Sequence, residues 1–251
     1  MTVWALGDLH LAFSVPEKTM EAFKKGWIGY TDKIRTNWCT HVGADDLVLI
    51  PGDISWAMHP DQARIDLEWI HALPGTKVLL KGNHDYWWSS LSKVEKVLPP
   101  SMHLIQNNVF NWQGFSIGGT RLWDTPEYNF YPYRDTVVDP DSKKVPRKEA
   151  KDPIEEERIF ERELARLEMS LKAFDPKAKM RIAMTHYAPI GAELHASRTS
   201  RILEKYRVDV CVFGHLHNLN NQLPMFGEKN GVRYLLTAAD YLEFVPIKIA
   251  D

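Results

Sequence analysis

Short apolar runs alternate with stretches of helical periodicity through the first hundred residues of the chain. This alternation is typical of βαβ units around a largely parallel sheet, because parallel strands need a crossover to return to the same end. Further apolar runs of strand length follow in the second half. Strands that each lead into a polar segment are predicted at residues 3–6, 47–50, 78–80, 182–184 and 208–213.

Helical patterns fall between residues 16 and 42, between 60 and 73, and from about 86 to 97, ahead of two prolines. The clearest helix follows Asp152, a favourable N-cap, with Pro153 at the first helical position and Glu155 at the capping-box position. Apolar residues then recur every three or four positions, which predicts one face lying on a sheet. A shorter helix is expected near 200–206.

The middle of the chain has a different pattern. Short apolar runs at 103–106, 109–112 and 115–117 are separated by turn residues, which predicts a small antiparallel meander and a mixed sheet. Closing strands are expected at 232–237 and 243–249.

Residues 121–153 have no clear period and carry several aromatic side chains after Arg121 and Trp123. A loop of this length is usually a functional lid or disordered. Two interpretations remain open: a lid that stacks a base or sugar, and a surface loop packed on itself.

The chain has 251 residues, 44% of them hydrophobic, which suits a single domain over 1–251 with an insertion at about 121–153. Its 31 basic and 33 acidic side chains do not mark a general polyanion binder, although they do not exclude nucleic acid. Cys39 and Cys211 provide no disulfide framework. The N-terminus lacks a basic leader, and no apolar run is long enough for a membrane helix. A cytoplasmic protein is expected.

Polar residues with metal-binding side chains follow each of the five strands predicted at 3–6, 47–50, 78–80, 182–184 and 208–213. Asp8 and His10 are two residues apart, as are His215 and His217, so on an extended segment each pair would point to one side. The carboxyl ends of parallel strands are where open α/β sheets build their sites. The segments are Asp8-Leu9-His10, Gly52-Asp53, Gly82-Asn83-His84-Asp85, Thr185-His186 and Gly214-His215-Leu216-His217.

These residues supply carboxylate, amide and imidazole ligands, and a carboxylate such as that of Asp53 can bridge two cations. Mixed nitrogen and oxygen ligands favour manganese, iron, zinc, cobalt or nickel over calcium. Two such ions can hold a hydroxide between them and clamp a phosphoryl group during in-line displacement. Each segment alone is compatible with an ordinary turn, cap or core histidine, and only their ordered coincidence predicts a dinuclear metal centre.

In this order, the segments resemble the signature blocks of the calcineurin-like metallophosphoesterases, over Asp8 to His217. The resemblance implies a two-sheet mixed β-sandwich flanked by helices, a four-layer α/β architecture. It implies that Asp8, His10, Asp53 and His217 ligate one metal ion, and that Asp53, Asn83, His186 and His215 ligate the other. His84 would contact the substrate phosphate and protonate the leaving group.

Trp56 departs from the protein-phosphatase branch of that family, where a second Asp stands at this position and orients the acid. A phosphoprotein phosphatase is therefore not expected, and diesters are favoured over monoesters. His84 would be oriented by Asp85 or by backbone.

The prediction is a dimetal phosphoesterase that attacks a small-molecule phosphodiester or phosphomonoester with a metal-bridging hydroxide. The alternatives are a nuclease and a catalytically idle metal-binding scaffold. No membrane partner is expected. Trp87 and Trp88 could wall the site, and His195, Arg198 and Arg201 could touch substrate oxygens.

Overall fold

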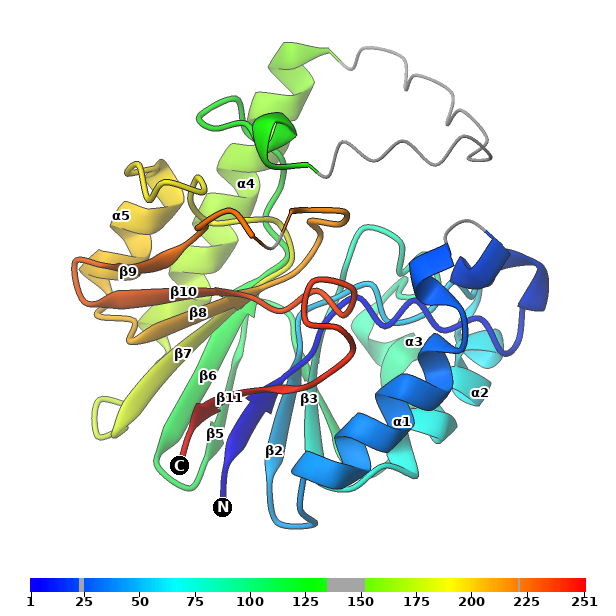
Figure 1. Cartoon of the computed structure of the whole chain (residues 1–251). Coiled ribbons are helices and arrows are strands. Elements are labelled where there is room, and N and C mark those ends of the chain that lie inside the picture. Colours follow the sequence, from blue (N-terminus) through cyan, green and yellow to red (C-terminus); the bar gives the residue numbers. More distant parts are fainter. Residues whose placement is uncertain (23–24, 135–151, 221) are drawn as a thin grey trace.

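The computed structural model describes residues 1–22, 25–134, 152–220 and 222–251. Two β-sheets pack face to face, and helices cover the outer face of each (Figure 1), as the predicted four-layer sandwich requires. The first sheet consists of β11 (Ile247–Ala250), β1 (Val3–Ala5), β2 (Leu47–Ile50), β3 (Thr76–Leu80) and β4 (Met102–Ile105), in that order. The second consists of β5 (Val109–Trp112), β6 (Phe115–Thr120), β7 (Met180–Thr185), β8 (Val210–Phe213), β10 (Val232–Leu236) and β9 (Gly227–Lys229).

Both sheets are mixed. The strands β1 to β4 are parallel, and β11 pairs antiparallel with β1 at the edge, which brings the two termini together (Figure 1). Helices α1 (Tyr30–His41), α2 (Pro60–His71) and α3 (Leu91–Glu95) lie beside the first sheet, and α4 (Pro153–Lys172) and α5 (Arg198–Lys205) lie beside the second. Short 3-10 turns are η1 (Pro16–Lys18), η2 (Met20–Ala22), η3 (Lys25–Trp27) and η4 (Tyr131–Tyr133).

The layer between the sheets is apolar. Leu49 and Val78 from the first sheet pack in one cluster with Ile182 and Val212 from the second, all fully buried. Because helices cover the outer faces as well, the central strands are buried on both sides. This explains why β2 and β8 are continuous apolar runs in the sequence rather than alternating patterns.

The predicted three-stranded meander is wrong. β4 pairs parallel with β3 in the first sheet, whereas β5 and β6 form an antiparallel hairpin in the second. Asn107 has a left-handed backbone, with φ of 65°, and the Asn108 side chain donates to the Leu104 carbonyl at 3.0 Å. This turn carries the chain from one sheet to the other, a step that local turn chemistry does not reveal.

Two predicted helices are shorter than expected. The region 16–42 contains three 3-10 turns before α1 begins at Tyr30. The region 86–97 contains only α3, because residues 84–89 form successive turns instead of a helix. Lys81 Nζ donates to the Trp88 carbonyl at 2.5 Å and ties these turns to the end of β3. Trp87 and Trp88 are buried by this arrangement, in the core between the first sheet and its helices.

The elements predicted in the C-terminal half of the chain agree more closely with the structure. Asp152 caps α4 by accepting from Ile154 N at 2.9 Å, and the apolar stripe of α4 lies against the second sheet. The short helix α5 starts at Arg198, behind a capping box formed by Ser197 and Ser200. The last strand is restricted to Ile247–Ala250, because turns occupy residues 238–245. The insertion is described only to Arg134 and from Asp152, so its role and the single-domain division stay predictions.

Within these described residues, no helix is long and apolar enough to cross a bilayer.

Candidate metal centre

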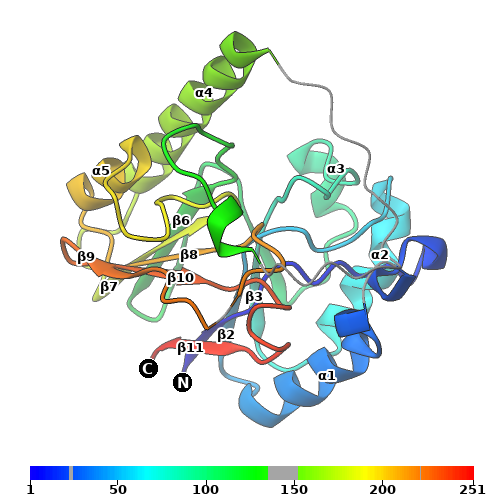
Figure 2. The same cartoon turned by 45° about the horizontal axis from the view of Figure 1, so that its top comes forward.

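The predicted site residues lie at one end of the sandwich, at the carboxyl ends of β1, β2, β3, β7 and β8. Figure 2 brings this end of the molecule forward and shows η4 lying between the helices of the two sides. Residues far apart in the sequence meet here because the parallel strands of both sheets end on the same side. The structure brings every predicted ligand into one of two clusters, which share Asp53.

The first cluster contains Asp8, His10, Asp53 and His217, whose candidate ligand atoms all lie within 4.8 Å of one another. His10 Nε2 is 3.1 Å from His217 Nε2 and 3.7 Å from Asp53 Oδ2. His217 Nε2 is 3.6 Å from Asp8 Oδ1. Apart from His217, these residues are buried, so the cluster is a compact set of two carboxylates and two imidazoles.

The second cluster contains Asn83, His186 and His215. Asn83 Oδ1 lies 2.7 Å from His186 Nε2 and 2.8 Å from His215 Nδ1. His186 Nε2 is also 3.5 Å from Asp53 Oδ1. The two oxygens of Asp53 therefore face different clusters, Oδ2 toward the first and Oδ1 toward the second. This is the arrangement a bridging carboxylate needs.

Small residues let the loops approach this closely. A Cβ on Gly82 would overlap the Asp53 carboxylate, and a Cβ on Gly214 would overlap the carboxylate of Asp8. Glycine is required at both positions because any side chain there would enter the space that the neighbouring carboxylate fills.

The backbone at the site differs from the extended geometry predicted for the spaced pairs. Asp8, His10, Asp53 and His215 have left-handed φ values of 54°, 46°, 50° and 70°. Such conformations in non-glycine residues cost about 1–3 kcal/mol each and cluster at functional sites. His215 and His217 also diverge, since His215 faces the second cluster and His217 the first. Left-handed turns, and not strand alternation, aim these side chains.

The hydrogen bonds of His186 fit a cation in the second cluster. Its Nδ1 lies 3.0 Å from the Pro51 carbonyl, which can only accept, so the proton is on Nδ1. Burial lowers the pKa of His186 to about 3, so the ring is neutral and Nε2 carries a lone pair. That lone pair faces the Asn83 carbonyl oxygen at 2.7 Å. Two acceptors at this distance suit a positive ion held between them.

Asp240 holds the ring of His217 as the Pro51 carbonyl holds the ring of His186. Asp240 was not predicted from the sequence. Its Oδ1 lies 2.8 Å from His217 Nδ1, so the other ring nitrogen, Nε2, is directed into the first cluster. Histidine ligands commonly donate their other nitrogen to a carboxylate in this way. Asp240 follows the predicted strand at 232–237, so the rule that found the other segments would have found it as well. Asp124, which follows β6 and lies 3.9 Å from His215 Nε2, was also missed.

Burial makes the carboxylates of the first cluster costly without a cation. It is the largest cause raising the pKa of Asp8 well above its usual value, and it also raises the pKa of Asp53. The His217 imidazole opposes the shift at Asp8, as the His84 imidazole does at Asp53. A divalent cation would compensate both desolvated carboxylates, and this cluster and the family indicate such ions.

His84 lies beside the clusters and packs against Trp56. Their ring centroids are 4.4 Å apart, and Trp56 also stacks on His10 at 5.1 Å. The backbone N–H of His84 donates to Asp53 Oδ1 at 2.8 Å, which fixes the main chain at this point.

The carboxylate of Asp85 connects the loops that carry Asp53 and Asn83. It accepts hydrogen bonds from four donors, which lie on the Gly52 loop and on its own loop. The donors are Ile54 N at 2.9 Å, Ser55 N at 3.1 Å, Gly82 N at 2.7 Å and Trp87 Nε1 at 3.0 Å. Burial raises the pKa of Asp85 to about 6. Which of Asp85 and backbone orients His84 stays a prediction.

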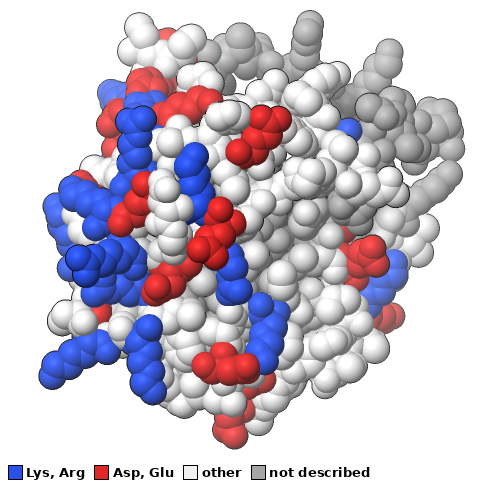
Figure 3. All heavy atoms as spheres, turned by 60° about the vertical axis from the view of Figure 1, so that its left-hand side comes forward, with Lys and Arg blue, Asp and Glu red and all other residues white. Residues whose placement is uncertain are grey.

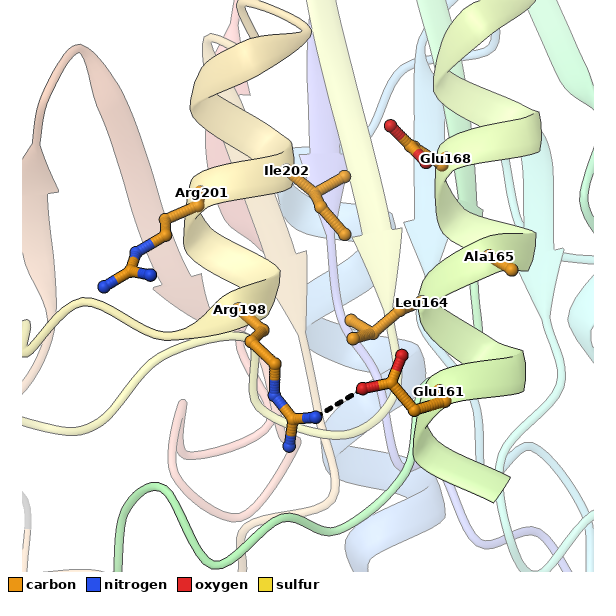
Figure 4. Close-up of a pocket in the computed structure, with 7 residues that line it drawn as sticks. All are labelled: Glu161, Leu164, Ala165, Glu168, Arg198, Arg201 and Ile202. Carbon is orange, nitrogen blue, oxygen red and sulfur yellow. Dashed lines mark hydrogen bonds and ion pairs between the residues drawn. The ribbon is translucent and has the colours of Figure 1, made fainter. Parts of the chain in front are cut away.

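The remaining candidates from the sequence lie elsewhere. Arg198 lines a hollow of about 350 Å³ between α4 and α5, where it pairs with Glu161, whereas Arg201 points away from α4 (Figure 4). Arg198 also pairs with Glu127 and Glu157. His195 is exposed and lies 3.7 Å from Glu193. These residues connect surface elements and are not gathered with the two clusters.

A two-sheet sandwich with a buried group of acids and histidines at its strand ends is the architecture of a metal-dependent hydrolase. The family model described as calcineurin-like phosphoesterase matches residues 1–219, and the chain belongs to this family. It is a metal-dependent phosphoric ester hydrolase.

Two solved structures are similar to the chain, and the first of them supports the fold. The chain is similar to phosphopantetheinyl hydrolase from Mycobacterium tuberculosis, with 14% identity, a TM-score of 0.51, and coverage of 99% of this chain and 95% of that one. It is also similar to a protein of unknown function from Aquifex aeolicus, with 18% identity, a TM-score of 0.47, and coverage of 98% and 95%. No curated protein matches the sequence.

Proposed function

We propose that the chain hydrolyses a phosphodiester or phosphomonoester with the help of two transition-metal ions, one at each cluster. The observation that carries this proposal is the orientation of Asp53, whose two oxygens face His10 and His186. A carboxylate turned to two histidine-containing clusters has little structural purpose without positive charge on both sides. Manganese, iron, zinc, cobalt and nickel all suit these ligands.

When bound, the two metal ions would neutralise charge at phosphoryl oxygens and lower the pKa of coordinated water. The chain itself holds the ligands in place. Asp8, His10, Asp53 and His217 would bind the first ion, and Asn83, His186 and His215 would bind the second together with Asp53. Pro51 and Asp240 accept from the outer nitrogens of His186 and His217, so the inner nitrogens face the clusters, where the ions would bind.

His84 is proposed as the general acid. Its main chain is attached to Asp53, and its ring lies 5.7 Å from the ring of His10, so it borders the same space as the first cluster. Loss of the leaving group from phosphorus requires a proton on the departing oxygen, which an imidazolium can donate. Trp56 provides an apolar face against which this ring packs.

Small phosphoesters are favoured over nucleic acid by the surface charge. On the face formed by α4 and α5, basic and acidic side chains are intermixed (Figure 3), with Lys205 paired to Glu168 and Arg198 to Glu157. A basic track that follows a phosphate backbone would need unpaired cations in a row. Diesters are favoured over monoesters because Trp56 stands where the phosphatase branch has an acid.

A hydrolysis assay tests the proposal. Purified protein reconstituted with manganese should cleave bis(p-nitrophenyl) phosphate or p-nitrophenyl phosphate, and Asp53→Asn or His84→Ala should abolish cleavage. Arg64→Gln, on the exposed side of α2, is the matched control and should retain the wild-type rate. Metal-dependent turnover that survives both site substitutions would overturn the assignment. A protein that binds metal but cleaves no member of a broad phosphoester panel would instead be the idle scaffold.

The nuclease alternative has a separate test. Binding of oligonucleotides that weakens steeply with salt would support it, since phosphate contacts release counterions. Binding that is absent at low salt would remove it.

A further inference from the structure

We propose that a cavity beside the second cluster binds the organic substituent of the phosphoester, and that this substituent is a planar ring system bearing a second anionic group. The cavity measures about 330 Å³. Tyr131 would contact the ring, and Arg134 would pair with the anion. This inference rests on the proposed function, because it assumes that the phosphoryl group lies at the metal clusters.

The position of the cavity follows from His215. This residue lies 2.8 Å from Asn83 Oδ1 through Nδ1, and it also lines the cavity. The Tyr187 ring, another part of the lining, packs on His215 with a centroid distance of 4.2 Å. A phosphoryl group at the second cluster would therefore have one of its ester substituents directed along His215 and into the cavity.

The aromatic walls are fixed by contacts of their own. The Tyr128 hydroxyl donates to the Ala188 carbonyl, and Phe130 packs on Tyr128 and Phe226 with centroid distances of 5.4 and 5.9 Å. Trp123 packs on Tyr187 at 5.3 Å and donates through Nε1 to Glu156 at 3.0 Å. These side chains pack among themselves and still line a hollow.

Tyr131 is the aromatic residue that this packing leaves out. It is 75% exposed and sits in η4, which is fixed at both ends. Its backbone N–H donates to Asn129 Oδ1 at 2.9 Å, and the Tyr133 carbonyl accepts from Asn220 N at 2.9 Å. An aromatic ring that is exposed to water on a well-anchored turn has apolar area to gain from a planar ligand.

Arg134 supplies the charge. It lines the same cavity, and its backbone forms an isolated bridge with Leu219. Within the described parts of the chain, no carboxylate pairs with its guanidinium, in contrast to Arg198, which pairs with Glu127, Glu157 and Glu161. A guanidinium binds carboxylate or phosphate through two parallel hydrogen bonds, so an anionic group on the substituent matches it.

The volume of the cavity limits the size of the ligand. Small-molecule sites occupy about 300–1,000 Å³, so this cavity lies at the lower end and suits one ring system with its attached group.

Inhibition of bis(p-nitrophenyl) phosphate hydrolysis tests the inference, with inorganic phosphate, adenosine 5′-monophosphate and adenosine 3′,5′-bisphosphate as probes. The inhibition constant should fall in that order, by roughly tenfold per step, because each probe adds one of the two contacts. Arg134→Gln should remove the advantage of the bisphosphate over the monophosphate. Tyr131→Ala should weaken both nucleotides without changing the constant for phosphate. Arg64→Gln should leave all three constants unchanged.

Calorimetric titration of the metal-free protein with adenosine 3′,5′-bisphosphate provides a readout without activity, and Arg134→Gln should weaken this binding about tenfold. Equal inhibition by all three probes, or a bisphosphate advantage that survives Arg134→Gln, would overturn the inference while the hydrolase assignment stands. A wild-type protein without hydrolysis would instead remove the proposed function, and the titration alone would then decide whether the cavity binds the probe.

Discussion

The two clusters that share Asp53 differ in charge and in access. The first contains the carboxylates of Asp8 and Asp53, and the rings of Trp27 and Trp56 pack around its histidines. The second adds no further carboxylate to Asp53, only an amide and two imidazoles, and its His215 borders a cavity. The first cluster should therefore hold its ion more tightly, and the second should be where the substrate enters.

This difference indicates a division of labour. On the proposed function, an ion at the first cluster would offset the cost of burying two carboxylates, whose pKa values burial raises. Substrate choice would then belong to the second cluster, where Asp124 lies 3.9 Å from His215 and residues of the segment 123–134 line the cavity that His215 borders.

The largest expected effect comes from the acid of the first cluster. Asp8→Asn removes a charge from a completely buried position while preserving shape, so it should lower manganese occupancy and reduce hydrolysis of bis(p-nitrophenyl) phosphate by about a thousandfold or more, which corresponds to ~4 kcal/mol. Steady-state rates and bound manganese, both determined at one fixed manganese concentration, measure this. Asp61→Asn, at an exposed position on α2, is the control. Retention of activity near the wild-type level would show that the first cluster does not hold an essential ion.

Removal of the acid behind His217 should have the next largest effect. Asp240→Asn leaves the inner ligands in place but no longer fixes the His217 proton on Nδ1, so manganese affinity should fall roughly 10- to 100-fold. The activity lost should return at higher manganese concentration. A variant whose activity stays low at every manganese concentration would contradict a role in orienting a ligand.

A smaller effect is expected at Trp56. Trp56→Leu removes the ring that packs on His84 and His10, so the turnover number should fall several-fold and the pH profile should change, whereas Trp56→Phe should restore most of the rate. Manganese titration should give the same affinity for both variants. Equal loss in the leucine and phenylalanine variants, with altered metal affinity, would place Trp56 in metal binding instead.

The last effect concerns the stability of the protein, and not its activity, and it arises at Asp66 in α2. Burial raises the pKa of Asp66 to about 6, above its unfolded value near 3.8, although Ser55 and Phe13 donate to it. The folded state therefore binds this proton more tightly, and the stability it contributes is complete below pH 3.8 and lost as pH rises through about 6.

The metal-free protein should thus lose about 2 kcal/mol of unfolding free energy from pH 4 to 7 relative to Asp66→Asn. Urea unfolding of both proteins in chelator measures this difference. A difference that is constant with pH, or that grows in favour of the wild type, would show that Asp66 is ionised in the folded protein.

Strand positions and the polar segments behind them could be predicted because burial between sheet and helices leaves long apolar runs in the sequence. The family resemblance implies the two-cluster arrangement, and the structure brings the same residues together. The left-handed backbone of Asp8 and His215 could not be predicted, because it goes with hydrogen bonds between loops far apart in the sequence: Asp8 N donates to the Gly52 carbonyl, and His215 N donates to the Asp8 carboxylate. The passage of the chain from β4 to the second sheet was missed for the same reason: tertiary packing, rather than local pattern, selects the partner of each strand.

The central claim is that Asp53 joins two metal sites, and counting bound metal tests it most directly. Protein stripped with chelator, reconstituted with manganese and freed of excess ion should contain two manganese ions per chain by mass spectrometry. Asn83→Ala, which alters only the second cluster, should retain one, and Asp53→Asn should retain fewer than the wild type. A wild-type protein that binds a single ion, or an Asp53→Asn variant that still binds two, would contradict the account.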